Sequence, residues 1–432
     1  MAFQQLMQSL VSASDAVMMG LIDQSSLAAV SLATQIAFVV SLFVFGLTGG
    51  GSILAAQYWG KGSREDVEEV FAIMLRPMVF VGSLFTLAAL CVPRLLMRIF
   101  TPEADLIALG SEYLQAVSLS YLLMCVSQSY LCIFRNSGRA ILASVIGSAG
   151  VVINIILNAI LIFGLLGFPA LGIRGAAIAT VITRIIEVAW VLLETARPER
   201  VKLRKCYFFG KCRLSRDYWS QSVVLTLNNL AWGLGITMGS VILGRLGSDA
   251  VAANSIASVM KNLINCFCMG LASGGAILVG NELGAGKLAR AKTYGGWVVI
   301  GALVSGVVSC GILVALTPLI LRLADLTVQA QAYLRFMIVV CGVNMIGMSN
   351  NSAIISGIFS AGGDTRFGLI CDCITLWGIV VPLGLLAAFV WELPIQIVYI
   401  IICMDEIIKL PAVWKHYRKY KWVRNLTVQQ EV

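Results

Sequence analysis

The chain has 432 residues, of which 59% are hydrophobic and 12% are charged, and its mean hydropathy is +0.90. Soluble domains carry about 25% charged residues, so this composition indicates an integral membrane protein. The single histidine, His416, lies in a basic tail. This excludes catalytic and metal sites that need two imidazoles. The twelve cysteines form no CxxC pair, and we interpret most of them as small core residues.

Apolar runs separated by polar breaks predict twelve membrane spans and an all-α fold. The predicted spans cover residues 1–22, 27–57, 68–92, 106–132, 140–166, 175–196, 218–244, 250–282, 291–320, 328–358, 366–390 and 394–414. No positively charged region precedes the first run, so we expect it to remain as a helix and not to be cleaved as a signal peptide.

The distribution of basic residues predicts the orientation. Segments on the side of the two termini hold 23 of the 31 Lys and Arg residues, and the opposite loops hold five. The other three, Arg184, Lys261 and Arg335, fall within spans. By the positive-inside rule we expect a multi-pass protein of the cytoplasmic (inner) membrane with both termini in the cytoplasm. The net charge of +9 is then a topology signal, and we expect no nucleic-acid partner.

An internal repeat with an offset of 224 residues divides the chain. The segment GLTGGGSILAAQYWGKG (46–62) matches GLASGGAILVGNELGAG (270–286) at 8 of 17 positions. We therefore predict two six-helix lobes, 1–196 and 218–414, related by a pseudo-twofold axis along the membrane normal. A basic cytoplasmic linker (197–217) joins them, and a basic cytoplasmic tail (415–432) follows. Two lobes of this kind are typical of transporters.

The glycines of the repeat have two predicted roles. Most of them allow close packing of helices, whereas Gly60 and Gly62 are predicted to end the second span. The sequence contains no GxxxxGK[ST] phosphate loop, so an ATPase is not indicated. Transport would use an ion gradient or the gradient of the substrate itself.

Four segments together resemble the multidrug and toxic compound extrusion (MATE) family, of bacterial type, across essentially the whole chain. They are SDAVMMG with Asp15, AAQYWGKG at the end of the second span, IFSAGGDTR (358–366) and KWVRNL from Lys421. The resemblance implies a V-shaped, non-enzymatic exporter that moves drugs and organic cations outward in exchange for H⁺ or Na⁺. It implies no cofactor besides the coupling ion, and we expect a monomer surrounded by membrane lipid.

The sequence departs from the family pattern at two candidate sites. Asn228 and Asn229 occupy a position in the seventh span where some branches have glutamate. The fifth span reads NIILN, from Asn154 to Asn158, where other branches have aspartate at the second position. Both departures favour a site in the first lobe with a single carboxylate.

Asp15 is the predicted ion-coupling residue, at a depth of about 10 Å below the outer end of the first span. Polar residues of other spans fall at a similar depth, and we group Asn154, Asn158 and Thr180 with it, with Gln35 and Tyr113 as candidate cavity residues. These oxygen ligands suit a transient Na⁺ at Asp15, Asn154 and Asn158 but no permanent metal, and the same carboxylate could carry H⁺. The alternative is that Asp15 only holds helices together by hydrogen bonds.

Charged residues inside the second lobe are further candidates, because intramembrane charges are costly. Lys261 and Asp372, together with Asn229, are candidate cavity or substrate residues, and the first two could instead pair with each other. Arg184 and Glu187 are three residues apart and are predicted to form a pair within one helix. Asp405 and Glu406 could lie at the membrane interface.

Two other functions compete with multidrug export. A lipid-linked saccharide flippase has a related architecture, but its cavity needs several basic residues to hold pyrophosphate, and this chain has only three within spans. An intramembrane enzyme would need a catalytic pair, and Asp15 and Asp372 belong to different lobes.

Overall fold

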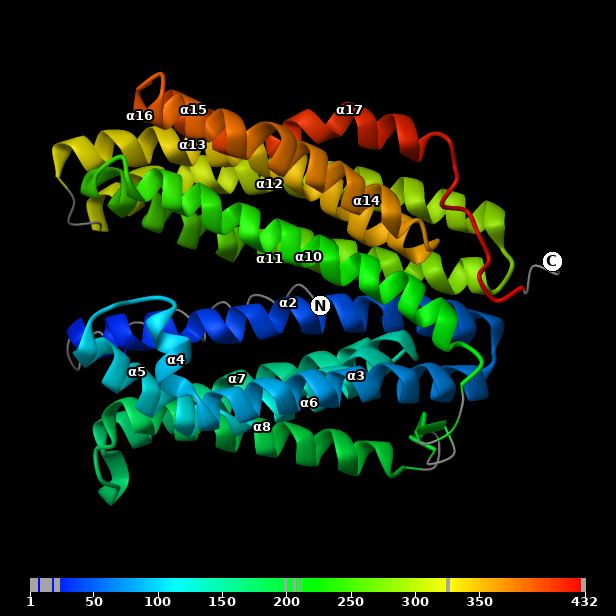
Figure 1. The fold of residues 1–432 in the computed structure, drawn as a ribbon. Coiled ribbons are helices and arrows are strands. Elements are labelled where there is room, and N and C mark those ends of the chain that lie inside the picture. Colours follow the sequence, from blue (N-terminus) through cyan, green and yellow to red (C-terminus); the bar gives the residue numbers. More distant parts are fainter. Residues whose placement is uncertain are drawn as a thin grey trace. The chain divides into compact units, whose positions relative to one another are not determined.

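The computed structural model describes residues 7, 18, 24–197, 200–204, 207, 208, 210, 212–323 and 327–428. The regular elements in these ranges are all helices (Figure 1). They divide into two compact units, which meet in the chain between Thr226 and Leu227, except that Gly60–Gly62 at the end of α2 group with the second unit. Apart from residues 7 and 18, the first predicted span, with Asp15, lies outside the described residues.

The first unit holds the described helices up to residue 226. They are α2 (Gln24–Lys61), α3 (Arg64–Cys91), α4 (Pro93–Arg98), α5 (Ala104–Val117), α6 (Leu119–Asn136), α7 (Ala140–Phe163), the short 3₁₀ helix η1 (Leu165–Gly167), α8 (Gly172–Thr195) and the beginning of α10 (Ser215–Gly244). Within the unit α3 packs on α6, and α8 packs on α5, α6 and α7.

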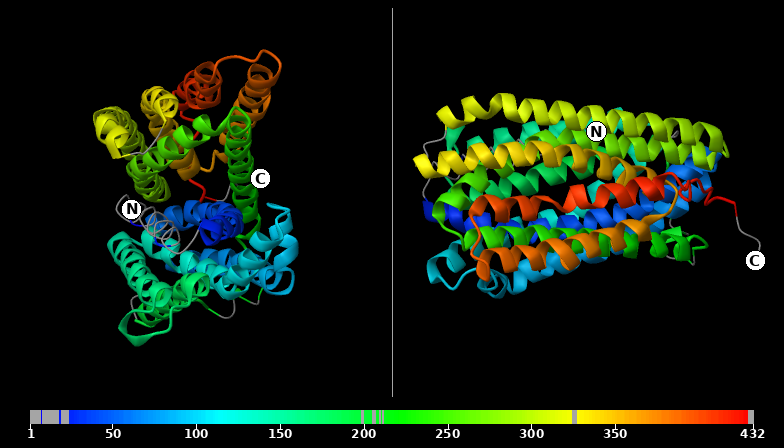
Figure 2. Two further views of the ribbon diagram at one scale, coloured as in Figure 1. Left: turned by 90° about the vertical axis from the view of Figure 1, so that its left-hand side faces the viewer. Right: turned by 90° about the horizontal axis from the view of Figure 1, so that it is seen from above.

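The second unit holds the rest of α10 and the helices that follow. They are α11 (Ser248–Gly284), α12 (Leu288–Leu323), α13 (Val328–Asn351), η2 (Ser352–Phe359), α14 (Thr365–Asp372), η3 (Cys373–Val380), α15 (Val381–Phe389), α16 (Ile395–Cys403) and α17 (Asp405–Tyr417). The segments η2 and η3 are π-helical. Within each unit the long helices run alongside one another (Figures 1 and 2).

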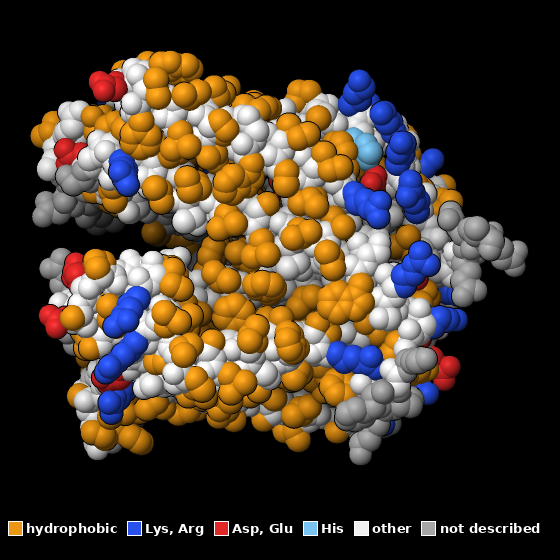
Figure 3. Space-filling model, in the orientation of Figure 1, with side chains coloured by type: hydrophobic (Ala, Val, Ile, Leu, Met, Phe, Trp, Pro, Cys, Tyr) orange, Lys and Arg blue, Asp and Glu red, His pale blue; other side chains and the backbone are white. Residues whose placement is uncertain are grey.

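Eight of the described helices are long and apolar enough to cross a membrane, and the bent pair α5 and α6 could add a ninth. This confirms the predicted all-α membrane architecture. Helix α10 covers the predicted seventh span, and α16 with α17 covers the twelfth, which is broken at Met404. Figure 3 shows hydrophobic side chains over the middle of each unit's visible face and charged side chains toward the helix ends. Exposed apolar residues such as Phe80 and Ile141 suit contact with lipid.

Helix packing reproduces the internal repeat. A Cβ atom on Gly82 would lie 2.8 Å from the Cα atom of Leu122. The residues 224 positions later behave in the same way, because a Cβ atom on Gly306 would lie 2.8 Å from the Cα atom of Ile346. Only glycine permits this approach of two backbones. The two units therefore share a contact that the sequence match did not include.

The glycines of the matched segment follow the prediction in part. Gly62 directly follows α2 and Gly286 lies two residues after the last residue of α11, and their φ angles of +82° and +74° are those expected for glycines that end a helix. The prediction for Gly60 is wrong, because Gly60 lies inside α2, where a Cβ atom would lie 2.0 Å from the carbonyl oxygen of Asn281. Close packing explains this residue.

Candidate ion and substrate sites

A buried amide pair lies on α7 in the first unit. Asn154 and Asn158 are four residues apart, so they share one face of the helix. The Nδ2 atom of Asn158 donates to Oδ1 of Asn154 at 3.2 Å, and the two residues are only 1% and 6% exposed, respectively. The surrounding helix is strongly apolar. The two amides therefore form a buried polar pair on one face of an apolar helix.

The other predicted first-lobe residues have different environments. The Thr180 hydroxyl donates to the carbonyl oxygen of Ala176 at 3.0 Å, within α8. Tyr113 on α5 is 8% exposed, whereas Gln35 on α2 is exposed. Helix α8 packs on both α5 and α7. The structure thus places three of the candidate-bearing helices in contact, while Asp15 lies outside the described residues.

Arg184 and Glu187 form the predicted pair within α8. The Nη1 atom of Arg184 lies 2.6 Å from Oε2 of Glu187. The carboxylate is buried, with 4% of the Glu187 side chain exposed. This intramembrane base therefore has its counter-charge on its own helix, which confirms the prediction.

The second unit contains a buried ionic cluster made by Asp372, Asp405, Glu406 and Lys409, which we call the second-lobe ionic cluster. The Nζ atom of Lys409 lies 2.8 Å from Oδ1 of Asp372 and 2.9 Å from Oε1 of Glu406. It lies 3.9 Å from Oδ2 of Asp405. The Lys409 side chain is 3% exposed. One ammonium group therefore faces three carboxylates inside the helix bundle.

Neighbouring side chains complete the surroundings of this cluster. Asn351 donates through Nδ2 to Oε2 of Glu406 at 2.8 Å and to the Glu406 carbonyl oxygen at 2.7 Å. The side chain of Asn228 on α10 lies close enough to Asp372 to act on its carboxylate. Lys261 on α11 is half-buried, and the charges of Asp405 and Glu406 act on it. Four helices besides α17 thus contribute a polar or charged group.

The backbone is irregular where the cluster forms. The twelfth span is interrupted between α16, which ends at Cys403, and α17, which begins at Asp405. Asn344 donates to the carbonyl oxygen of Cys403 at 2.5 Å. The π-helical segments η2 and η3 begin directly after Asn351 and Asp372. Broken and π-helical turns inside membrane helices mark functional sites in many proteins.

Sequence reasoning missed the role of Lys409. It counted Lys409 among the 23 basic residues on the side of the two termini, but the structure buries it inside the second unit. Asp372 forms its ion pair with Lys409. This pair replaces the suggested pairing of Asp372 with Lys261. Glu406 is 7% exposed, so its carboxylate lies within the helix bundle. The signal was present as the spacing of Asp405, Glu406 and Lys409, which places both acids on the face of the lysine.

Asn229 remains a candidate substrate residue of the second unit. It is half-buried on α10, next to Asn228. The two residues are adjacent, so their side chains point in directions about 100° apart around the helix. Of the two directions, that of Asn228 brings its amide near Asp372.

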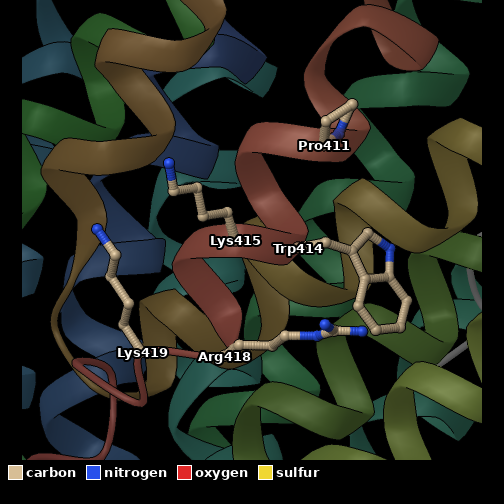
Figure 4. Close-up of a pocket in the computed structure, with 5 residues that line it drawn as sticks. All are labelled: Pro411, Trp414, Lys415, Arg418 and Lys419. Carbon is tan, nitrogen blue, oxygen red and sulfur yellow. The ribbon is translucent and has the colours of Figure 1, made fainter.

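A separate cavity lies near the carboxy-terminal end of α17 (Figure 4). It has a volume of about 480 Å³ and is lined by Pro411, Trp414, Lys415, Arg418 and Lys419. The guanidinium of Arg418 lies 5.9 Å from the centre of the Trp414 ring. Three basic residues around this cavity would repel an organic cation, so it is not a suitable substrate site.

The basic linker is anchored to the acidic beginning of α3, within the first unit. Nε of Arg204 lies 2.6 Å from Oε2 of Glu68, and Nη2 of Arg213 lies 2.6 Å from Oδ1 of Asp66. The backbone NH of Leu214 donates to Oε1 of Glu69 at 2.9 Å. Glu68 and Glu69 are buried beneath the linker, with 3% and 6% exposed.

Comparison with known proteins agrees with this architecture. The family model described as MatE matches residues 1–160 and 226–386, two stretches that begin about one repeat length apart. The probable multidrug resistance protein NorM of Thermotoga maritima is 22% identical over 437 residues, with 99% of this chain and 92% of the relative covered. The probable multidrug resistance protein NorM of Mesorhizobium japonicum is 27% identical over 417 residues, with 90% and 85% covered.

Solved structures have the same fold. A MOP superfamily transporter from Pyrococcus furiosus matches with a TM-score of 0.88 at 18% sequence identity, over 98% of this chain and 94% of that chain. A multidrug resistance MATE family transporter in an outward-facing conformation matches with a TM-score of 0.87 at 18% identity, over the same shares of the two chains.

Proposed function

Because the chain belongs to the MATE family, we propose that it exports small organic compounds, often cationic, by alternating access and in exchange for H⁺ or Na⁺. As a member of this family the chain is a multi-pass membrane transporter and not an enzyme. The proposal adds the coupling ion, the direction of transport and the residues that carry it. We also propose that the protein acts as a monomer, with both termini in the cytoplasm.

The buried amide pair of Asn154 and Asn158 carries the proposal for ion coupling. Both amides are more than nine-tenths buried in an apolar helix. Burial of an amide costs free energy unless its polar atoms have hydrogen-bond partners or a ligand. We propose that Asp15 supplies the carboxylate next to them and that Thr180 and Tyr113 line the same site. Asn229, Gln35, Lys261 and Asp372 are proposed to affect the handling of substrate.

The environment of two of the three bases within the predicted spans, Arg184 and Lys261, supports export of cations over a flippase activity. Arg184 is paired with Glu187, and the acids of the second-lobe ionic cluster act on Lys261. Bases whose charge is already compensated hold pyrophosphate poorly, because the anion would have to displace a carboxylate.

The test is efflux by Asp15→Asn, which keeps the shape of the side chain and removes its charge. We expect this variant to reach the membrane but to lose transport against a gradient, in an efflux-deficient host and in proteoliposomes with an imposed H⁺ or Na⁺ gradient. Asp105→Asn is the matched control, because it removes an exposed carboxylate of the same lobe. Export by Asp15→Asn at the wild-type rate would refute the proposed coupling site.

A further inference from the structure

Helix α17 has a buried face and an exposed face. The buried residues recur at intervals of three or four and form one side of the helix: Glu406, Lys409, Val413 and Tyr417. The residues two positions away point in nearly the opposite direction, because two residues correspond to about 200° around a helix. These residues form an exposed stripe, and they are Met404, Ile407, Pro411, Lys415 and Arg418. The second unit therefore leaves one side of α17 uncovered.

This exposed stripe changes from apolar to basic along its length. Its first three residues lie within the twelfth predicted span, 394–414, and Lys415 and Arg418 follow directly after that span. Trp414, the last residue of the span, is half-buried beside the stripe, and tryptophan is enriched at the membrane–water interface. Figure 3 shows Lys and Arg side chains gathered at one end of the second unit. The stripe thus combines apolar surface inside the membrane with positive charge at its boundary.

The cavity at the end of α17 lies where the apolar and basic parts of the stripe meet. Pro411 and Trp414 line it together with three basic residues, and its volume is about 480 Å³. In Figure 4 the side chain of Arg418 extends beneath the Trp414 ring, and those of Lys415 and Lys419 extend together in another direction. Pockets for small organic ligands measure about 300–1,000 Å³. The cavity therefore has room for a phosphate ester with the organic groups attached to it.

The three basic residues of the cavity lack a counter-charge. Lys409 and His416, which lie on the same helix, each face a carboxylate. By contrast, Lys415, Arg418 and Lys419 form no ion pair with the carboxylates of the part of the chain that the structure describes. Three like charges around one cavity repel one another, and an anion that binds there is attracted by all three.

We propose that this cavity binds the phosphate headgroup of one anionic phospholipid, whose acyl chains lie along the apolar part of the exposed stripe. Lys415, Arg418 and Lys419 neutralise the headgroup, and Trp414 packs against the interfacial part of the lipid. A soluble phosphate would contact the same three bases. Only a ligand with acyl chains also covers the apolar residues that continue the stripe. The proposal goes beyond the proposed transport activity and does not depend on it.

The experiment measures phospholipid binding to purified, delipidated full-length protein in detergent. Phosphatidylglycerol is titrated in parallel with phosphatidylcholine, which has the same phosphate but also a positive choline group. Native mass spectrometry counts the bound lipid, and the thermal unfolding temperature is recorded at each concentration. We expect phosphatidylglycerol to fill one saturable site and raise the unfolding temperature, and phosphatidylcholine to bind this site about tenfold more weakly or less. Inorganic phosphate, which has no acyl chains, should not raise the unfolding temperature.

Two pairs of substitutions locate the site. Lys415→Gln with Arg418→Gln removes two charges of the cavity. Lys287→Gln with Arg290→Gln is the matched control, because it removes two exposed basic residues of the same unit that do not line the cavity. We expect the cavity variant to bind phosphatidylglycerol about tenfold more weakly or less and the control to bind it like the wild type. Lys415→Arg with Arg418→Lys keeps both charges and should retain binding, which separates loss of charge from a change in folding.

Three results would overturn the proposal. The first is equal affinity of the cavity variant and the wild type for phosphatidylglycerol. The second is equal affinity of the wild-type protein for the two phospholipids, a comparison that needs no variant to fold. The third is a rise in unfolding temperature with inorganic phosphate that matches the rise with phosphatidylglycerol, because the cavity would then bind a soluble anion and not a lipid.

Discussion

Lys409 and Asp372 form an ion pair with 2.8 Å between Nζ and Oδ1, and they come from different helices of the second unit, α17 and α14. The carboxylate of Glu406 contacts the same ammonium group at 2.9 Å. Lys409 therefore has two carboxylate partners at short distance, whereas Asp372 and Glu406 share this one ammonium group as their nearest positive charge. This asymmetry predicts unequal effects of removing the partners.

Lys409→Met is expected to be the most destabilising change in the cluster, by about 3–5 kcal/mol, because it leaves buried carboxylates uncompensated. Asp372→Asn should cost less, because Lys409 keeps Glu406 as its partner. The double variant Asp372→Asn with Lys409→Met should be more stable than Lys409→Met alone. Thermal unfolding of the purified proteins ranks the three. An equal loss in both single variants would show that the charge balance does not control stability here.

The repeated glycine contacts predict matched effects in the two units. Gly82→Ala and Gly306→Ala should each destabilise by about 1–3 kcal/mol, because the new methyl group meets the backbone of Leu122 or Ile346. Gly296→Ala, also on α12, is the control, because no atom lies within 4 Å of its added Cβ. It should be neutral or stabilising by about 0.5–1 kcal/mol. The measurement is again the unfolding temperature, and a destabilised control would refute the packing argument.

Much of this architecture was predictable from the sequence because lipid imposes strong rules. A membrane helix needs a long apolar run, and the described helices follow the predicted spans closely. The repeat was readable because glycines at close contacts and at helix ends tolerate few replacements. The pairing of Arg184 with Glu187 was predictable because it is local, three residues apart on one helix.

The second-lobe ionic cluster was not predictable in the same way. Lys409 follows an apolar run near the carboxyl terminus, where a basic residue ordinarily lies in the cytoplasm. Its burial depends on the break at Met404, and no glycine or proline marks this break in the sequence CMDE (403–406). The contact with Asp372 joins residues 37 positions apart. Such a contact depends on how helices pack, which hydropathy does not report.

The contacts between the linker and α3 predict protection from proteolysis. Glu69 is buried and accepts a hydrogen bond from the backbone of Leu214, and Glu68 binds Arg204. Replacing both acids by alanine should release the linker and speed trypsin cleavage between residues 197 and 217 by about tenfold or more, because cleavage follows the population of the open segment. Asp105→Asn, far along the chain from the linker, should leave the rate unchanged. Unaltered cleavage of the double variant would mean that these contacts do not hold the linker.

The last prediction concerns orientation, and two native cysteines test it. Cys91 is exposed at the end of α3 that the charge distribution assigns to the outside, and Cys212 lies in the linker assigned to the cytoplasm. In single-cysteine variants that retain one or the other, an impermeant maleimide added to intact cells should label Cys91 and not Cys212. Permeabilised cells should give labelling of Cys212 as well, because its side chain is partly exposed. Labelling of Cys212 but not Cys91 in intact cells would reverse the orientation, and with it the side from which the coupling ion enters.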